Sequence, residues 1–338
     1  MKRTDKYIWM CSLLSILLLA ACSDEDGNGK VKAKIQEIAV KTNVAGMLTR
    51  TTTIDNSTAL QDYDIKIDAY FHDTETAYLS SEKLHYTGGD PSWSFWDGSA
   101  ALHYYWPIAG SVYEPAGANI TFSSLDFVGF CPYDKPLYIG TPTYNHSTGV
   151  TFTATLPTTE VEDVDYMTLT NQASLQEYLV AVLDGQTYAT QDAAGGALPL
   201  QFKHPFALIK FVITAESGTH VQINSISIEG LKTTGTCAYD GTTMTWSSLS
   251  GSATMKLEQV LKVGETTETT PFMVIPNTYG SKYLTVNATW DDWSNTVTIS
   301  DYGKNVDFNW EAGHIYTYNL TLDKYGLKVD AAKYTEQW

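Results

Sequence analysis

The chain has few cysteines and almost no arginine. The two cysteines in its long body, Cys131 and Cys237, lie far apart in the sequence. We expect both to be buried small hydrophobic side chains rather than the halves of a disulfide. Arginine occurs only at Arg3 and Arg50, so lysine carries most of the positive charge. The sequence therefore excludes a small disulfide-rich scaffold.

Positive charge is scarce over the whole chain. Lys and Arg number 21 against 38 Asp and Glu, which gives a formal net charge of −17. Because nucleic acids and anionic lipid surfaces are polyanions, a body with this charge repels both. Nucleic acid is therefore excluded as a partner. After the first 21 residues, no apolar stretch is long enough to span a membrane.

Motifs of catalysis are also missing. There is no Gly-x-Ser-x-Gly elbow, His-Glu-x-x-His pair or phosphate-binding glycine loop, and the histidines are scattered without ligand spacing. One dense acidic cluster comprises Glu160, Glu162, Asp163 and Asp165. It could offer oxygen ligands to calcium, but it lacks the glycine turn of a calcium loop and suits a solvated loop better. We predict no catalytic residue, metal or cofactor, and a secreted hydrolase is the weakest hypothesis.

The first 21 residues have the pattern of a secretory signal peptide. A basic start precedes an apolar run from Ile8 to Ala20, which is too short for an ordinary spanning helix. The run ends in Leu19-Ala-Ala-Cys22, which resembles the lipobox of bacterial lipoproteins. The resemblance implies cleavage between Ala21 and Cys22 and a lipid on Cys22. Such a lipid would anchor the protein in the outer membrane.

Residues 22–30 form an acidic tether with nothing apolar to bury. The run Ser23-Asp-Glu-Asp26 resembles the export signal that follows the lipidated cysteine in surface lipoproteins of Bacteroidetes. This resemblance favours a surface-exposed protein. A plain spacer on a lipoprotein that faces the periplasm is the alternative.

The body of the chain alternates apolar and polar residues with a period of two, which predicts an all-β fold. The segments 63–71, 284–290 and 316–322 show this pattern, with turn residues between them. The one helical candidate, Gln172 to Leu183, could equally be a strand with an entry loop. A glycine pair, Gly195-Gly196, marks a domain boundary. We expect one β-sandwich over residues 31–195 and a second over 196–338.

Several short stretches, in this order and behind a lipobox, resemble the fimbrillin-like family, the subunits of type V pili in Bacteroidia. The resemblance implies two tandem transthyretin-like β-sandwich domains and covers most of the sequence after the signal peptide. The stretches are Leu125-Asp-Phe-Val-Gly-Phe-Cys-Pro-Tyr133, Val164-Asp-Tyr-Met167, Leu200-Gln-Phe-Lys-His204, Val274-Ile-Pro276 and Trp310-Glu-Ala-Gly-His-Ile-Tyr-Thr-Tyr318.

The family resemblance also implies a processing step. An Arg-specific, trypsin-like protease cuts the loop after the first strand, which is expected here at Val31 to Val40. The cut would fall between Arg50 and Thr51, where the usual alanine of the family site is replaced by threonine. Independently of the family, Arg50 is the only arginine after the signal peptide. A surface arginine without a role is the alternative explanation.

The C-terminal residues 325–338 are the candidate for the strand that would replace the first strand after this cut. Tyr325, Leu327, Val329 and Ala331 alternate with mostly polar residues, which is typical of a β-strand with one apolar face. The segment could be an internal edge strand of its own domain. In the family scheme it is a donor strand, which refills the groove of a neighbouring subunit.

We therefore predict a structural and adhesive pilus subunit, a surface lipoprotein of the outer membrane that enters a fimbrium after processing. The expected partners are other pilus subunits, the protease, the membrane through the lipid, and a host protein or glycan. One alternative is the pilus anchor subunit. Another is a non-polymerising lipoprotein that binds glycans through Trp93 to Trp106, although aromatic residues in strands more often fill the core.

Overall fold

The computed structural model describes residues 36–44, 57–89, 92–114, 119–173, 175–215, 220–258, 261–263, 266–291, 297–323, 326–330 and 333–337. All of these residues belong to one unit of the chain, Gln36–Trp338. The predicted signal peptide, residues 1–21, and the tether, residues 22–30, lie outside the described residues. No helix in the described part of the chain is long and apolar enough to cross a membrane.

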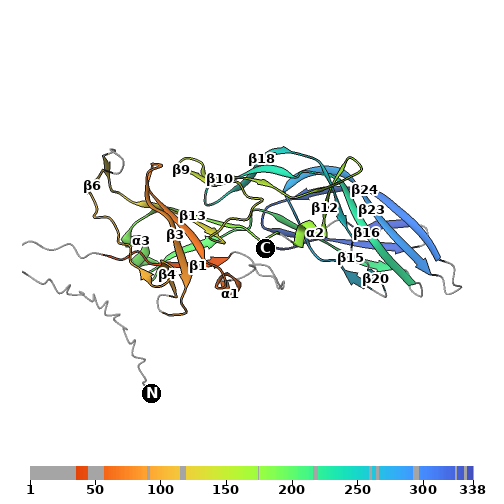
Figure 1. The fold of residues 1–338 in the computed structure, drawn as a ribbon, viewed down its shortest axis with the longest axis horizontal. Helices are drawn as coiled ribbons and strands as arrows, with labels where there is room; N and C mark the ends of the chain where they lie inside the picture. Colours follow the sequence, from red (N-terminus) through yellow and green to blue (C-terminus); the bar gives the residue numbers. More distant parts are fainter. Residues whose placement is uncertain are drawn as a thin grey trace, which may run out of the picture. The chain divides into compact units, whose positions relative to one another are not determined.

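The described residues are mostly β-strand, so the predicted all-β fold is confirmed (Figure 1). The first half of the chain contains β1 (Val40–Val44), α1 (Ser57–Leu60), β2 (Ile65–Phe71), β3 (Ala77–Tyr86), β4 (Trp93–Trp96), β5 (Ala101–Leu102), β6 (Val112–Tyr113), β7 (Ile120–Thr121), β8 (Leu125–Cys131), β9 (Thr143–Asn145), β10 (Gly149–Thr155), β11 (Thr159–Val161), β12 (Val164–Thr168), α2 (Leu169–Ala173), β13 (Leu179–Gln186) and α3 (Tyr188–Ala193).

The second half of the chain is built from strands. They are β14 (Leu198–Phe202), β15 (Ala207–Ala215), β16 (His220–Leu231), β17 (Thr234–Tyr239), β18 (Met244–Ser250), β19 (Ala253–Leu257), β20 (Leu261–Val263), β21 (Thr266–Glu268), β22 (Phe272–Val274), β23 (Asn277–Asp291), β24 (Val297–Trp310), β25 (His314–Asp323), β26 (Gly326–Val329) and β27 (Lys333–Gln337).

The strands pair into open sheets. A seven-stranded sheet has the order β11-β12-β19-β16-β23-β24, with β20 also paired to β16. One six-stranded sheet has the order β13-β8-β2-β3-β4-β5. A second has the order β21-β15-β25-β26, with β22 on β15 and β27 on β25. The smaller sheets are β18-β17-β10-β9, β1-β14 and β6-β7.

The buried side chains form two hydrophobic clusters. The N-terminal cluster is built largely from β1 to β5, β8 and β14, and the C-terminal cluster largely from β10 and β15 to β25. Strand β8 serves both, because successive side chains of a strand point to opposite faces. Phe127 lies in the N-terminal cluster, and Val128 and Phe130 lie in the C-terminal cluster. This double burial explains why β8 has an almost continuous apolar sequence.

The two cysteines of the body behave as predicted. Cys131 is buried in the N-terminal cluster and Cys237 in the C-terminal cluster, and neither forms a disulfide. Burial raises the pKa of both thiols, which keeps them protonated and unreactive.

Three sequence boundaries can be compared with the elements. The window Gln172–Leu183 contains the end of α2 and the start of β13, so most of its regular structure is strand. The predicted first strand, Val31 to Val40, overlaps β1 only at Val40, and residues 31–35 lie outside the described part. The proposed boundary at residues 195 and 196 stays a prediction. Strand β14, just beyond it, pairs with β1 and contributes to the N-terminal cluster.

Candidate functional site

The first described residues, 36–44, which we call the N-terminal segment, are seated in the N-terminal cluster. Their three branched aliphatic side chains, Ile38, Val40 and Val44, are 2%, 2% and 5% exposed. Strand β1 runs parallel to β14, in a register that pairs Val40 with Leu198 and Val44 with Phe202. The segment therefore completes a hydrophobic core that the rest of the chain builds around it.

Backbone hydrogen bonds hold the start of the segment on its other side. The Ile38 N–H donates to the Tyr104 carbonyl at 2.8 Å, and the Trp106 N–H donates to the Gln36 carbonyl at 2.8 Å. The Leu198 N–H donates to the Ala39 carbonyl at 2.8 Å and begins the ladder with β14. We call the space between residues 104–106 and β14 the groove.

One buried side chain, Gln191 of α3, fastens the segment between these two ladders. Its Oε1 accepts from the Ala39 N–H at 3.0 Å and from the Trp106 Nε1–H at 3.0 Å. Its Nε2 donates to the Glu37 carbonyl at 3.0 Å. Because these groups are buried, loss of any partner would leave a polar atom without a hydrogen bond. Gln191 was not singled out in the sequence, where a lone glutamine carries no signal.

The aromatic residues predicted to be core line the same groove. Trp93, Phe95 and Trp106 are buried, whereas Tyr105 is 44% exposed. A cavity of about 390 Å³ lies alongside residues 36–40 and is lined in part by Trp93, Phe95 and Gln191. The burial of these rings leaves them unable to stack on a sugar at the surface, which disfavours glycan binding through this stretch.

One inward-facing group of the segment is poorly matched to its surroundings. The Thr42 Oγ1 is buried and has no hydrogen-bond partner among the residues that the structure describes. A buried hydroxyl without a partner costs about 1–3 kcal/mol. The segment therefore fits its groove imperfectly at Thr42, and we call this buried, unpaired hydroxyl the defect of the segment.

The candidate donor strand is present at the other end of the chain. Strand β26 pairs antiparallel with β25, and β27 pairs antiparallel with another part of β25. Leu327 and Val329 are partly buried and pack against the C-terminal cluster. Strand β26 is an edge strand of its sheet, since its one neighbour in the strand order is β25. Tyr325 and Ala331 lie outside the described residues.

The residues predicted for lipidation and processing also fall outside the described part of the chain. These are Ala21 and Cys22 at the signal cleavage point, and Arg50 and Thr51 at the protease site. Strand β1 ends at Val44, six residues before Arg50 in the sequence. The predicted cut would therefore separate the whole N-terminal segment from the body.

A polar cluster that the sequence did not reveal joins three distant parts of the chain. The His72 Nδ1 lies 2.7 Å from Asp126 Oδ1 and 3.4 Å from Asp184 Oδ1. Asp126 is buried and also accepts from the Gly185 N–H and the Tyr144 hydroxyl, each at 2.7 Å. The turn after β2, strand β8 and the end of β13 bring these residues together. Such tertiary contacts leave no spacing pattern in the sequence.

These groups perturb one another's protonation. The pKa of Asp184 is raised to about 6 by its hydrogen bond with Asp126, by burial and by the Asp126 charge. Burial alone would raise the pKa of Asp126, but hydrogen bonds from Asp184, Gly185, Tyr144 and His72 lower it. Burial would likewise lower the pKa of His72, but the Asp126 carboxylate raises it. Of the two carboxyl groups, Asp184 therefore takes up a proton first as the pH falls.

The same cluster is the group of potential metal ligands that the described residues bring together. A cation there would have to displace the hydrogen bonds that already satisfy Asp126. The predicted acidic loop is instead the exposed hairpin between β11 and β12, where Glu162 and Asp163 have φ angles of 50° and 64°. Its carboxylates do not converge as a ligand group in the described part of the chain.

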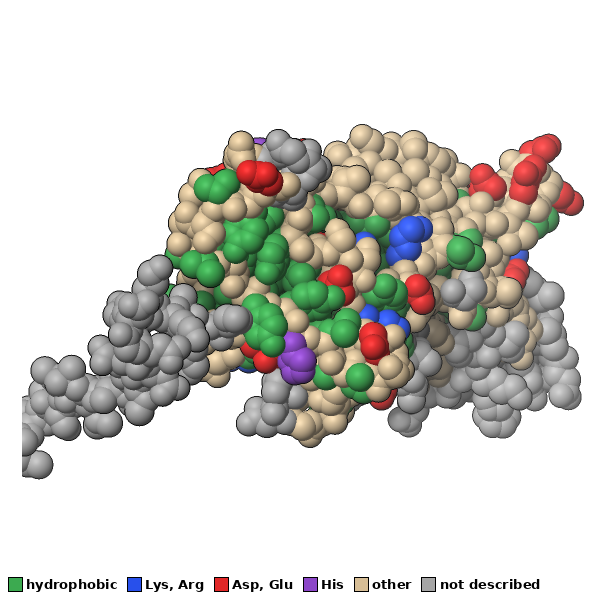
Figure 2. Space-filling model, turned by 60° about the vertical axis from the view of Figure 1, so that its left-hand side comes forward, with side chains coloured by type: hydrophobic (Ala, Val, Ile, Leu, Met, Phe, Trp, Pro, Cys, Tyr) green, Lys and Arg blue, Asp and Glu red, His purple; other side chains and the backbone are tan. Residues whose placement is uncertain are grey.

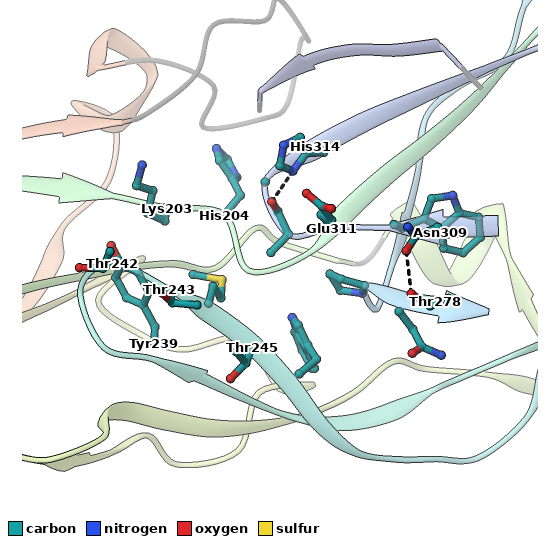
Figure 3. Close-up of a pocket in the computed structure, with 17 residues that line it drawn as sticks. Lys203, His204, Tyr239, Thr242, Thr243, Thr245, Thr278, Asn309, Glu311 and His314 are labelled. Carbon is teal, nitrogen blue, oxygen red and sulfur yellow. Dashed lines mark hydrogen bonds between the residues drawn. The ribbon is translucent and has the colours of Figure 1, made fainter. Parts of the chain in front are cut away.

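A second cavity, of about 680 Å³, lies between the β17–β18 turn and the β24–β25 turn (Figure 3). Burial lowers the pKa of His204 on its wall to about 3, so this imidazole is uncharged at neutral pH. The Thr278 hydroxyl donates to Asn309 Oδ1 at 2.8 Å, and the His314 Nδ1 lies 2.6 Å from the Ala312 carbonyl. The first contact joins strands β23 and β24, and the second lies at the β24–β25 turn.

The site geometry defines an all-β protein with one strand buried at its N-terminal end and an edge strand near its C-terminal end. The sequence profile of the fimbrillin-like family matches residues 49–338. The chain belongs to this family, which confirms the resemblance found in the sequence. It is therefore a fimbrial or adhesin subunit, a structural protein rather than an enzyme.

Three solved structures that match this chain come from species of Bacteroides and Porphyromonas. A candidate cell adhesion protein of Bacteroides uniformis is 17% identical over 89% of this chain and 99% of its own, with a TM-score of 0.48. One of Bacteroides ovatus is 15% identical over 89% and 97%, with a TM-score of 0.49. The tip fimbrial protein Mfa3 of Porphyromonas gingivalis, truncated at its C-terminus, is 10% identical over 90% and 100%, with a TM-score of 0.39. A search of curated proteins gives no match.

Proposed function

We propose that the chain is exported as a lipoprotein, cut after Arg50, and polymerised into a surface fimbria by donor-strand exchange. In this scheme the N-terminal segment fills the groove until the cut. The C-terminal residues 325–338 of a second subunit then replace it. The partners are other pilus subunits, an Arg-specific trypsin-like protease and the outer membrane, which holds the precursor by the lipid on Cys22.

The observation that carries this proposal is the seating of the N-terminal segment. It is a short strand buried in the N-terminal cluster, and the only arginine after the signal peptide lies six residues beyond its end in the sequence. Burial of Ile38, Val40 and Val44 contributes on the order of 5–8 kcal/mol, as an upper bound. A cut at Arg50 makes this segment a separate peptide, so its departure no longer requires the body to unfold.

Departure of the segment would create the need for a partner. It would expose the apolar side chains below Ile38 and Val40 and the unpaired backbone groups of β14 and of residues 104–106. Unpaired strand edges and open apolar grooves are satisfied by an added strand, as in donor-strand complementation. The edge strand β26 supports its role as donor, because it can leave its sheet by breaking a single ladder.

The adhesive role is supported by the surface of the N-terminal half. Tyr105, Ile108 and Val112 are 44%, 58% and 59% exposed, although they are large hydrophobic residues. Figure 2 brings the end of the described unit that carries β3, β4 and β6 forward, and hydrophobic side chains gather in the middle of that face. Exposed apolar patches are typical of surfaces that bind other molecules. A host protein suits this face better than a glycan that stacks on the buried Trp93 and Trp106.

The test is a set of single substitutions at the cut site, expressed in cells that make the fimbria. Arg50→Ala and Arg50→Lys should both block the cut by an Arg-specific protease, and Thr51→Ala should keep it. Subunit ladders on gels run without boiling should vanish for the first two variants and persist for the third. Ladders from Arg50→Ala equal to those of the wild type would refute processing at this site. A fimbria whose subunit keeps an acylated Cys22 would instead identify the anchor subunit.

A further inference from the structure

Gln191 recognises the backbone of the N-terminal segment and touches none of its side chains through hydrogen bonds. It accepts from the N–H of residue 39 and donates to the carbonyl of residue 37, both at 3.0 Å. Any strand that fills the groove in this direction has a carbonyl and an N–H two positions apart. Gln191 can therefore bind an incoming strand whatever its sequence, but it does so at a fixed pair of positions.

The Gln191 side chain is held rigidly. Helix α3 begins with a capping box, in which Thr187 and Thr190 each bond the backbone of the other. The helix ends at Ala193, and Gly195 and Gly196 follow it with φ angles of 85° and 89°, which favour glycine. The Trp106 indole N–H donates to the same Oε1 that binds the segment. An incoming strand must therefore adjust to Gln191, because Gln191 has little freedom to adjust to the strand.

The donor strand could align with the N-terminal segment in several registers, and the buried positions of the segment distinguish between them. Positions 38, 40 and 44 are buried apolar, and position 42 holds the Thr42 hydroxyl that lacks a partner in the described structure. With Leu327 at position 38, Lys333 would enter the buried site of Val44. With Leu327 at position 42, Asp323 would enter the buried site of Ile38. Both registers bury a charge without a partner.

The remaining register places Leu327 at position 40. Tyr325, Val329 and Ala331 then occupy positions 38, 42 and 44, and every inward residue is uncharged. Val329 takes the place of Thr42 with a side chain of the same shape and no hydroxyl, so the defect of the resident segment is removed. In this register Gly326 stands at position 39 and Lys324 at position 37.

We propose that Gln191 sets the register of the donor strand, by binding the N–H of Gly326 and the carbonyl of Lys324 of a second copy of this chain. The inference rests on the proposed strand exchange and adds to it the residue that selects the register. It also favours the donor strand over the N-terminal segment, because the donor places Val329, which has no hydroxyl, at position 42.

The test measures capture of a labelled peptide of residues 322–333 by the full chain nicked at Arg50. A second peptide carries an ester in place of the peptide bond between Tyr325 and Gly326, which removes the Gly326 N–H. Gln191→Met removes the protein side of the same contact. The control is Gln172→Met, since the Gln172 amide makes the same kind of contact with the backbone of Met273, at 2.7 and 3.2 Å, on β22 rather than in the groove.

The proposal predicts that the ester weakens capture about fivefold in the wild type and in Gln172→Met, from the typical value of one hydrogen bond. In Gln191→Met the ester should change capture less than twofold. An equal ester effect in all three proteins would overturn the register while leaving strand exchange intact. If the nicked wild type captures neither peptide, the proposed exchange itself is wrong. The comparison of the two peptides on the wild-type protein remains valid even if a substituted protein does not fold.

Discussion

The N-terminal segment and strand β26 are held in their places in different ways. The segment has buried side chains, a ladder with β14, backbone bonds to residues 104–106 and the Gln191 contact. Strand β26 has one ladder, on β25, and its Leu327 and Val329 are only partly buried. The first strand is an integral part of a core, whereas the second lies on the edge of one.

This difference assigns the two strands different tasks. A strand fixed by burial on this scale leaves a folded body at a useful rate only after the chain is cut. An edge strand with one ladder and partly buried side chains can leave and return at a smaller cost. The buried Thr42 hydroxyl weakens the binding of the N-terminal segment in the groove, so a donor strand without this hydroxyl would be favoured there.

A charge placed inside the N-terminal segment should destabilise the uncut protein severely. Val40→Asp buries a carboxylate at a position that is 2% exposed, and we expect the free energy of unfolding to fall by about 3–5 kcal/mol. Asn43→Asp, on the exposed side of the same strand, should change it by less than about 0.5 kcal/mol. Chemical denaturation of the uncut chain measures both. Equal effects would mean that β1 is not an integral part of the core.

The same kind of charge in β26 should spare the monomer and abolish assembly. Leu327→Asp places a carboxylate on a partly buried edge strand, so we expect a loss of about 1–2 kcal/mol in the monomer. In a neighbour's groove, position 40 is fully enclosed, and ladder formation should be lost. Lys328→Asp, on the exposed face, is the control and should polymerise normally. A polymerising Leu327→Asp protein would remove β26 from the scheme.

Removing the buried hydroxyl should strengthen the resident strand. Thr42→Val should raise the free energy of unfolding of the uncut chain by about 1 kcal/mol and slow release of the fragment after the cut about fivefold. Thr151→Val is a suitable control, because the Thr151 hydroxyl bonds Thr143 at 2.8 Å and valine there brings no gain. Release is followed by size-exclusion chromatography after nicking. Faster release from Thr42→Val would contradict the account of the defect.

The smallest effect is a pH dependence in the body that both strands share. The pKa of Asp184 is raised to about 6 in the folded protein, above its unfolded value. Stability from this group is therefore present at low pH and is lost as the pH rises through about 6. Asp184→Asn should raise the melting temperature at pH 7.5 and change it little at pH 4.5.

Much of the fold could be predicted from the sequence, because it depends on local alternation. Residues 63–71 were expected to alternate, and Ile65, Ile67, Ala69 and Phe71 of β2 are buried. The burial of Cys131 and Cys237 as free thiols was predicted from their distance in sequence and from the hydrophobic character of an unpaired cysteine. The start of the predicted first strand, Val31 to Val40, lies outside the described residues, and β1 continues beyond its predicted end to Val44. Before Val40, the backbone of Gln36 and Ile38 bonds residues 104–106 and does not form a regular ladder with β14.

The candidate site was predicted only in outline. The sequence indicates a removable first strand and an alternating C-terminal run, because each is a local pattern. It gives no sign of Gln191, Thr42 or the His72–Asp126–Asp184 cluster. Gln191 and the His72–Asp126–Asp184 cluster each depend on polar groups that are more than fifty residues apart in the sequence. The Thr42 hydroxyl is notable because it has no partner among the described residues. Such matches follow from tertiary packing, which period and composition do not encode.

The most direct test of the central claim is the first residue of the subunit in fimbriae sheared from intact cells. Mass spectrometry of the purified fibre identifies both the N-terminal peptide and any peptide from residues 22–50. The account predicts that the subunit begins at Thr51 and that residues 22–50 are absent. A fibre subunit that begins at an acylated Cys22 and retains the N-terminal segment would contradict it.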